Sequence, residues 1–188
     1  MPPRGANVKD RLTQAAVELI SERGWSAVST RTLAERAGVG PGLVHYHFPS
    51  LQALRIHAAT QTLHTVVEQA AELLQPTTTP RQGLTLILGE LDRYPGDDPA
   101  SRLVHEAYLA ATRDPDLRQA ITDVLNLMRH HLTHWLTAND VPNPHQTATV
   151  LAATLDGILL HRALTPDLAS TDIEPILARL LTHQGAHR

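Results

Sequence analysis

The spacing of apolar residues predicts helices along almost the whole chain. In successive segments, apolar residues recur three and four positions apart, which is the period of a helix with one buried face. Glycine, proline and capping residues separate these segments. The segments lie at about 8–23, 30–37, 41–47, 51–74, 81–93, 99–112, 115–137, 145–164 and 172–181. The sequence therefore predicts an all-α fold of about nine helices.

Residues 29–50 have the pattern of two short helices joined by a tight turn. Ser29 or Thr30 can cap the first helix, because a hydroxyl group accepts a hydrogen bond from an unpaired backbone N–H. Gly38 can end that helix in the left-handed conformation that glycine adopts without strain. Pro41 suits the first position of the second helix, where the missing N–H costs nothing.

The second short helix is expected to bury one face and expose the other. Val44 and Phe48, which are four residues apart, should lie together on the inward face. The outward face has no evident role in the core, so this helix is suited to enter a groove on a partner. Its outward residues are Gly42, Leu43, His45, Tyr46 and His47.

The segment AGVGPGLVHYHFPS, residues 37–50, resembles the helix-turn-helix of the tetracycline-repressor (TetR) family of bacterial transcriptional regulators. The resemblance is specific over about residues 8–56 and rests on the A-G-V turn, the helix start and the H-F-P-S exit. It implies an N-terminal DNA-binding domain of three helices over residues 1–49. It further implies a larger helical domain over residues 50–188 that binds an effector and forms a dimer.

Two positions depart from the usual pattern of the family. His45 stands where the family usually has a tyrosine, and Leu51 stands where it usually has a lysine. Both of those family residues commonly contact phosphate. A histidine can still donate a hydrogen bond to a phosphate, more strongly when it is protonated. A leucine cannot.

The resemblance also implies how the chain would contact DNA. The second helix of a helix-turn-helix lies in the major groove, and a dimer reads two half-sites that form an inverted repeat. Gly42, Leu43 and Tyr46 would face base edges. None of them can form a bidentate hydrogen bond with a base, so thymine methyl groups and DNA shape should provide selectivity. The residues expected at phosphates are Ser29, Thr30, Arg31, His45 and His47, with the backbone of Gly40, Pro41 and Gly42.

The segment 145–164 is apolar on two faces and therefore needs two partners. One partner is expected to be the core of the same chain and the other a second subunit, which Gly157 would allow to approach closely. Thr171 and Glu174 predict a capping box for the final helix. The last two helices would form a four-helix bundle with a second subunit; alternatively, both faces belong to the core of one chain. The expected interface residues are Leu151, Leu155, Gly157, Ile158, Ile173, Ile176, Leu177 and Leu180.

A pocket for a small-molecule effector is expected in the larger domain. The helix predicted at 51–74 would be about 35 Å long and could carry movement between the two domains. Polar residues on otherwise apolar helices indicate a ligand with both hydrogen-bonding groups and apolar bulk. Taken alone, each of them is more typical of a surface residue or a satisfied core residue than of a ligand site. The expected ligand-binding residues are His57, Gln61, His64, His105, Tyr108, Met128, His131 and Trp135.

The distribution of charge agrees with a DNA-binding N-terminal part. The chain has 188 residues and a formal net charge of −3. Residues 1–50 hold six Lys/Arg and four Asp/Glu and are net positive, whereas residues 51–188 hold ten and fifteen and are net negative. The positive charge thus lies on the part that the motif assigns to DNA.

Metal and enzyme chemistry have little support. With no cysteine, the chain has no disulfide, thiol nucleophile or cysteine-based metal site. His130 and His134 share a helix face beside His131, but no clear third ligand accompanies them, so we expect solvated histidines, no metal and no cofactor. The sequence has neither G-x-S-x-G nor a glycine-rich phosphate loop, so we expect no enzyme activity.

The location of the protein is predicted from the lack of targeting signals. No apolar run approaches the roughly 18 residues of a membrane span. Residues 1–7 are too few and too polar for a signal peptide. We therefore expect a cytoplasmic protein.

These patterns together favour a ligand-responsive transcriptional regulator. We expect a homodimer that represses by binding an inverted-repeat operator and leaves it when a small molecule binds. The alternative is a helical small-molecule-binding protein or enzyme whose helix-turn-helix is vestigial. The acidic total charge and Leu51 favour that alternative.

Overall fold

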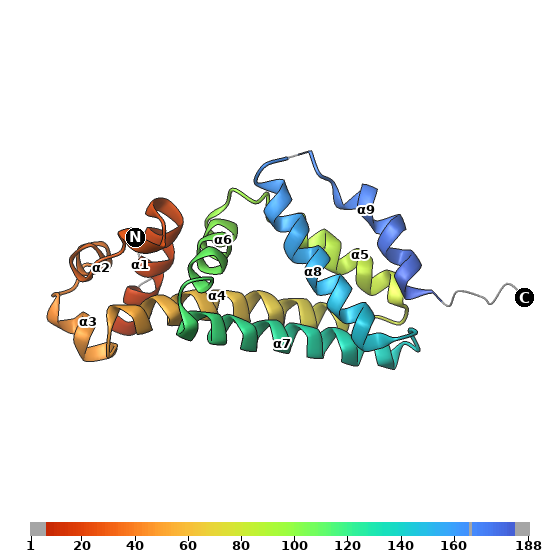
Figure 1. The fold of residues 1–188 in the computed structure, drawn as a ribbon, viewed down its shortest axis with the longest axis horizontal. Coiled ribbons are helices and arrows are strands. Elements are labelled where there is room, and N and C mark those ends of the chain that lie inside the picture. The colour runs from red at the N-terminus through yellow and green to blue at the C-terminus, as the bar shows by residue number, and fades with distance from the viewer. Residues whose placement is uncertain (1–6, 166, 183–188) are drawn as a thin grey trace, which may run out of the picture. The chain divides into compact units, whose positions relative to one another are not determined.

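The computed structural model describes residues 7–165 and 167–182, and all regular secondary structure within these ranges is helical (Figure 1). The residues 1–6 considered above for a signal peptide lie outside them. The elements are α1 (Val8–Arg23), η1 (Trp25–Ala27), α2 (Thr30–Ala37), α3 (Gly42–His47), α4 (Leu51–Leu74), α5 (Pro80–Leu91), α6 (Pro99–Ala111), α7 (Pro115–Ala138), α8 (Pro144–Arg162), α9 (Ser170–Leu177) and η2 (Ala178–Leu181). The all-α prediction is confirmed.

The chain divides into two compact units. The head unit combines Met1–His64 with Asp98–Ile121, and the body unit combines Thr65–Asp97 with Thr122–Arg188. The head unit thus holds α1, η1, α2, α3 and α6, and the body unit holds α5, α8, α9 and η2. The long helices α4 and α7 each contribute residues to both units. A domain boundary at residues 49 and 50 stays a prediction.

Side-chain caps begin several helices. The Asn7 side chain accepts a hydrogen bond from the backbone N–H of Asp10, at 2.9 Å. Ser50 caps α4 in the same way through the N–H of Ala53, at 3.0 Å. Asp98 and Asp114 cap α6 and α7, each followed by proline in the first turn. These caps satisfy backbone donors that have no partner inside the helix, so they fix where each helix begins.

The core of the head unit is aliphatic and centres on α1. Its fully buried members include Leu12, Leu19, Leu33, Val44 and Leu54. Trp25 and Val28, between α1 and α2, are buried as well. Arg36 ties α2 to α1 through Glu22, at 2.6 Å, and Glu18, at 3.1 Å.

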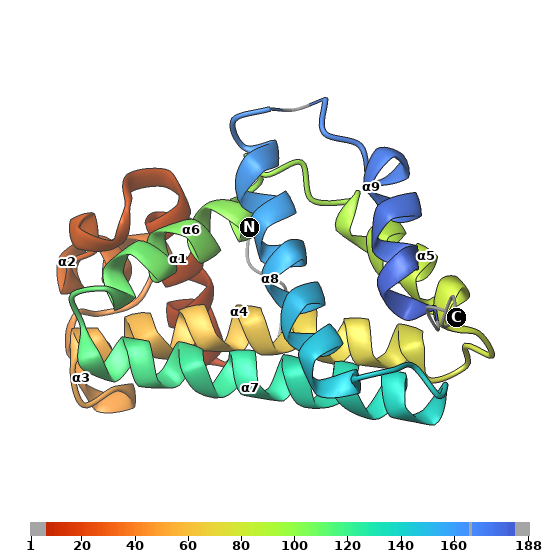
Figure 2. The same cartoon turned by 45° about the vertical axis from the view of Figure 1, so that its right-hand side comes forward.

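Helix α6 packs against α1 within the head unit, as Figures 1 and 2 show. Glu106 on α6 accepts a hydrogen bond from the backbone N–H of Trp25, at 2.8 Å. Arg55 on α4 donates to the carbonyl oxygen of Val28. The segment between α1 and α2 is therefore held by side chains from two other helices.

The core of the body unit is built from α5, α8 and the parts of α4 and α7 that belong to it. Leu84, Leu88, Leu136 and Leu151 are among its most buried members. Figures 1 and 2 show α9 beside α5, and α9 closes this core through Leu177.

A buried arginine joins three segments of the body unit. Arg162, at the end of α8, donates to the carbonyl oxygens of Leu91, at 2.7 Å, and Leu168, at 3.0 Å. It also donates to Ser170 at 2.7 Å and pairs with Asp92. The arginine thereby joins the end of α5, the loop after α8 and the start of α9 through hydrogen bonds.

The predicted capping box of the final helix is wrong. Helix α9 begins at Ser170, and no side chain caps it. The Ser170 hydroxyl instead bonds Asp92 and the carbonyl oxygen of Leu88, and Glu174 faces Thr85 and Arg81 on α5. The α-helix also ends at Leu177 and continues as a 3-10 turn, two residues after a proline.

Replacing Arg162 with methionine, R162M, should destabilise the protein strongly. The variant keeps an apolar stem but leaves the carbonyl oxygens and Asp92 without their donor. Breaking a buried ionic network lowers the free energy of unfolding by about 3–5 kcal/mol. Because Asp92 is half-exposed, we expect a loss at the lower end of this range, about 3 kcal/mol. Urea unfolding would measure the loss. The control is Arg93→Met, whose exposed pair with Glu90 is worth at most ~1 kcal/mol. Equal losses in the two variants would contradict the assigned role.

Candidate functional site

The turn between α2 and α3 is held by backbone geometry and one arginine. Gly38 adopts the left-handed conformation, with φ 63° and ψ 41°, as predicted. The N–H of Val39 bonds the carbonyl oxygen of Ala34, at 3.0 Å. Arg11 on α1 donates to the carbonyl oxygen of Ala37 and, at 2.8 Å, to that of Gly38. The arginine thereby occupies acceptors that the end of α2 leaves free.

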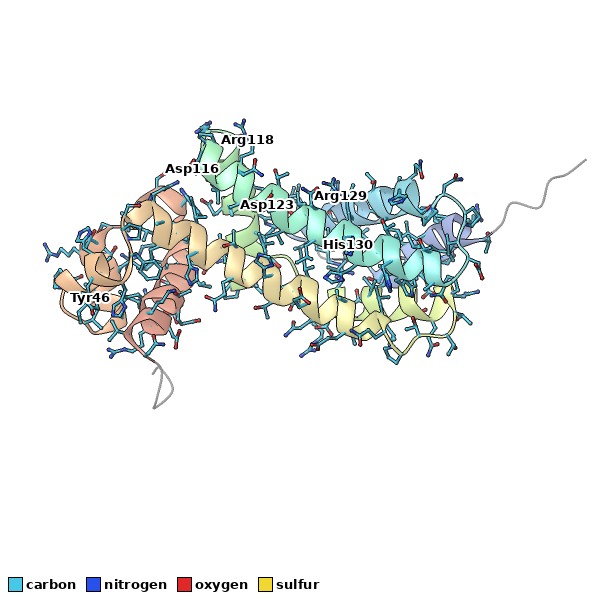
Figure 3. All side chains as sticks on the ribbon, turned by 90° about the horizontal axis from the view of Figure 1, so that it is seen from below. Tyr46, Asp116, Arg118, Asp123, Arg129 and His130 are labelled. Atoms are coloured by element: carbon cyan, nitrogen blue, oxygen red, sulfur yellow. The ribbon has the colours of Figure 1, made fainter. Side chains whose placement is uncertain are left out.

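Helix α3 buries one side and exposes the other. Val44 and Phe48 are buried in the head core, whereas Tyr46 is 81% exposed and Leu43 is 37% exposed. Figure 3 labels Tyr46 at the surface of this helix. The helix begins at Gly42, so Pro41 is the capping residue and not the first helical residue as predicted. Because Leu43 and Tyr46 are exposed, the outward side of α3 takes no part in packing the head core.

The start of α2 lies exposed as expected. Ser29 and Thr32 form a reciprocal capping box. Arg31 is exposed and bonds Glu35 through its Nε atom, at 2.8 Å, which raises the pKa of Arg31. The predicted phosphate contacts on α2 and α3 are thus accessible, apart from the half-buried Thr30 and His47, and their roles stay predictions.

A lysine and a histidine pack around the end of α3. The Nζ atom of Lys9 lies 5.7 Å from the centre of the Phe48 ring. The His57 ring lies 5.5 Å from the same ring. Burial lowers the pKa of His57, and the charge of Lys9 lowers it further. His57, expected at the ligand, is therefore part of the head unit around Phe48.

The eight expected ligand residues fall into both units. Five belong to the head unit: His57, Gln61, His64, His105 and Tyr108. Gln61 and His64 are exposed there, and burial is the main cause that lowers the pKa of His105. The other three, Met128, His131 and Trp135, belong to the body unit. The ligand roles of all eight stay predictions.

A cavity of about 880 Å³ lies between α4 and α7 within the body unit. It brings together His131 and Trp135 from the expected set. The Nε2 atom of His131 lies 3.6 Å from Glu68 Oε1, too far for a hydrogen bond. This nitrogen is buried and has no hydrogen-bond partner among the described residues. The lining residues are Glu68, Ala71, Glu72, Leu74, Gln75, Thr77, Thr78, His130, His131, His134, Trp135, Ala138 and Asn139.

Trp135 is held in place as one wall of this cavity. Its Nε1 donates to the hydroxyl of Thr77 at 3.0 Å. On α5, a methyl group added at Gly83 would lie 2.3 Å from the indole ring. The indole therefore sits where a side chain at position 83 would otherwise stand.

Sequence reasoning missed the acidic residues of the cavity. Glu68 and Glu72 are exposed carboxylates on α4, and such residues usually belong to a solvated helix face. Their four-residue spacing places them on one face, and that spacing was the available signal. Only the packing of α7 against the same face of α4 gives the pair a cavity.

The two faces of α8 differ in burial. Leu151, Ile158 and the α9 residue Leu177 are buried in the core of the single chain. Their assignment to a dimer interface, like that of the other five residues, stays a prediction. The other face of α8 is open, and an added methyl group at Gly157 would meet no atom within 4 Å. The exposed large apolar residues of α8, its following turn, α9 and η2 are Val150, Leu160, Leu164, Ile176 and Leu180.

The described part of the chain has neither a metal-binding cluster nor a membrane-spanning helix. No group of three or more His, Cys, Asp or Glu residues there could hold a metal ion. No helix over the same residues is long and apolar enough to cross a membrane.

Comparisons with known proteins match both parts of the chain. Residues 12–58 match the family described as "Bacterial regulatory proteins, tetR family". Residues 57–183 match "Tetracyclin repressor-like, C-terminal domain". The chain belongs to the TetR family. It is a ligand-responsive DNA-binding transcriptional regulator with an N-terminal helix-turn-helix and a helical C-terminal domain.

Individual TetR-family relatives match over nearly their whole length. The HTH-type transcriptional regulator BetI 1 of Chromohalobacter salexigens is 29% identical, with 92% of each chain covered. The crystal structure of the transcriptional regulator SCO7518 from Streptomyces coelicolor has a TM-score of 0.81 at 27% identity, covering 94% of this chain and 99% of that one. The multidrug binding protein EbrR, complexed with imidazole, has a TM-score of 0.66 at 28% identity, covering 97% and 99%.

Replacing Gly38 with alanine should weaken the turn that positions α3. A left-handed backbone costs a residue with a Cβ about 1–2 kcal/mol, and this Cβ would lie 3.0 Å from Arg11 Nη2. We expect urea unfolding to show a decrease of that size in the free energy of unfolding. We also expect faster amide exchange in α2 and α3. The control is Gly40→Ala, where a Cβ meets no atom within 4 Å. If G40A lost as much stability as G38A, the turn would not be the cause.

Proposed function

We propose that this regulator represses transcription as a homodimer that inserts one α3 helix into each half of an inverted-repeat operator. The observation that carries the proposal is the exposure of Tyr46 on a helix whose opposite side is fully buried. A helix held this way presents its outer residues without having to unfold. Leu43 and Tyr46 offer apolar contacts to thymine methyl groups, and DNA shape supplies further selectivity.

The apolar residues left exposed on the body unit support the dimer. Leu164 is 81% exposed and Ile176 is 56% exposed. Apolar residues gathered on adjacent C-terminal elements are typical of a surface that another protein covers. A two-fold dimer is the commonest closed assembly, and it would present two α3 helices with the symmetry of an inverted repeat.

The cavity between α4 and α7 supports an effector site in the body unit. An effector releases the operator only if it binds better to a conformation that fits DNA less well. Helix α4 begins three residues after Phe48 and ends at the cavity. A change of the cavity walls would therefore act on a helix that is continuous with the DNA-binding part.

The chemistry of the cavity favours an organic cation as the effector. Glu68 and Glu72 are carboxylates, and the lining contains no lysine or arginine to neutralise them. Trp135 adds an aromatic ring, which attracts cations through its π-electrons. The two carboxylates therefore give the cavity an anionic wall beside this ring.

Replacing Tyr46 with alanine should remove selective DNA binding. The operator-like duplex would be one selected from a random library by the wild-type protein, with an unrelated duplex for comparison. We expect Y46A to bind the selected duplex at least tenfold more weakly and no better than the unrelated one, since each lost base contact costs about 1–3 kcal/mol. Mobility shifts would measure both affinities, and circular dichroism would verify that helix content is unchanged.

The matched control for Tyr46 is Leu109→Ala. Leu109 is an apolar residue of the head unit that is 60% exposed on α6. The L109A substitution should leave the affinities for both duplexes unchanged. Unchanged selectivity in Y46A would contradict the assignment of α3. A wild-type protein with no selective binding at all would favour a helical small-molecule-binding protein.

Replacing Glu72 with glutamine should weaken cation binding in the cavity. The probes are benzyltrimethylammonium and the uncharged dimethyl benzyl carbinol, which has nearly the same shape. We expect calorimetry to detect the cation in the wild-type protein and not the carbinol. E72Q should bind the cation about fivefold to tenfold more weakly, because one nearby carboxylate is lost.

The control for Glu72 is Asp97→Asn, an exposed carboxylate outside the cavity. It should bind the cation as the wild-type protein does. Equal binding of the two probes would contradict a cationic effector, and a cavity that binds only the carbinol would favour a neutral one.

A further inference from the structure

The outward side of α3 carries no permanent positive charge. Its residues are a glycine, a leucine, a tyrosine and two histidines, and α4 begins with Leu51, Gln52 and Ala53. Phosphates line both edges of a DNA major groove and dominate the affinity of most DNA-binding proteins. A cation is therefore needed close to α3, and it has to come from another element.

Arginines around this site are already engaged in the fold. Arg11 bonds the turn, Arg36 pairs with two glutamates of α1, and Arg55 bonds a carbonyl oxygen behind α2. Arg31 is exposed, but it lies at the start of α2 and is paired with Glu35. Each of these contacts would have to be given up, or shared, for a phosphate contact.

Lys9 is different. It is the only lysine in the chain. It is exposed in the first turn of α1, and it forms no ion pair with any carboxylate among the described residues. Its ammonium group lies 5.7 Å from the centre of the Phe48 ring, and Phe48 is the residue that directly follows α3. The structure thus places the unpaired ammonium group of Lys9 at the end of α3.

The Phe48 ring holds Lys9 without using its hydrogen bonds. A ring attracts an ammonium group through its π-electrons, which leaves the three N–H donors for another partner. The ring itself is fixed, since Phe48 is buried and packs against His57. Burial and the charge of Lys9 both lower the pKa of His57, so His57 stays neutral at neutral pH and does not repel the lysine.

We propose that Lys9 binds a DNA phosphate at the edge of the groove that α3 enters. The inference rests on the proposed DNA-binding function and adds the group that supplies charge to the α3 end of the site. It also explains how the chain functions with leucine at position 51. The ammonium group beside Phe48 supplies, from α1, a charge that the start of α4 lacks.

The salt dependence of DNA binding tests this proposal. Each phosphate neutralised by a lysine adds about 0.9 to the slope of log affinity against log salt concentration. We expect K9Q to lower the slope by about that amount for each bound protomer, on both the selected and the unrelated duplex. K9R keeps the charge and should keep the slope. Fluorescence anisotropy over a series of salt concentrations would measure the slopes of the wild-type protein, K9Q and K9R.

Two further variants make the result specific. Arg23→Gln removes an exposed charge at the other end of α1, about 21 Å away, and should keep the wild-type slope. Leu51→Lys in the K9Q background places a cation at the start of α4, three residues after Phe48, and should restore the lost slope. Restoration would connect the effect of Lys9 with a phosphate near Phe48.

Failure of this proposal is distinguishable from failure of the proposed function. If the wild-type protein binds selectively and Y46A abolishes selectivity, but K9Q keeps the full slope, Lys9 does not contact phosphate. The proposal is equally overturned if R23Q lowers the slope as much as K9Q does. Loss of selective binding in the wild-type protein would instead contradict the function itself.

Discussion

The short turn between α2 and α3 determines how this regulator presents itself to DNA. Its direction follows from one left-handed glycine, Gly38, and from the guanidinium group of Arg11 on two carbonyl oxygens behind it. Helix α3 has only six residues, so it could not hold its own direction in water. Its inward residues pack in the head core, and the turn sets the angle between α2 and α3. Everything proposed about DNA recognition depends on that angle.

In the proposed DNA complex, charge and selectivity come from different elements. The outward side of α3 offers leucine, tyrosine and histidine, which suit apolar contacts and DNA shape. The permanent cations stand outside that helix, at Arg31 on α2 and Lys9 on α1. The proposed effector cavity has the opposite character, with Glu68 and Glu72 beside Trp135. The two ends of α4 therefore lie near sites of opposite charge preference, one for a polyanion and one for a small cation.

The sequence predicted the fold well where a rule acts locally. Caps at Asn7, Ser50 and Asp98 depend on neighbours within three residues, so helix starts were predictable. The capping box proposed for α9 failed because Arg162, from the preceding helix, sets a network that takes up Ser170 and leaves α9 uncapped. That contact depends on how α8, α5 and α9 pack, which no local pattern contains.

The same limit applies to the sites. Helix α8 is apolar on two sides, and its sequence did not tell which side faces the core. The structure buries Leu151 and exposes Val150. The exposed side of α3 was predictable, since its two inward residues are four apart. The cavity was not, because its carboxylates look like ordinary surface residues until α7 lies beside them.

In the proposed dimer, two α3 helices are offered to DNA in two-fold symmetry. Hydroxyl-radical footprinting of the full-length protein, on a duplex that it selects from a random library, tests this most directly. We expect two protected windows centred about 34 Å apart, or one helical turn, over sequences related by inversion. A single protected window, or two windows over a direct repeat, would contradict it.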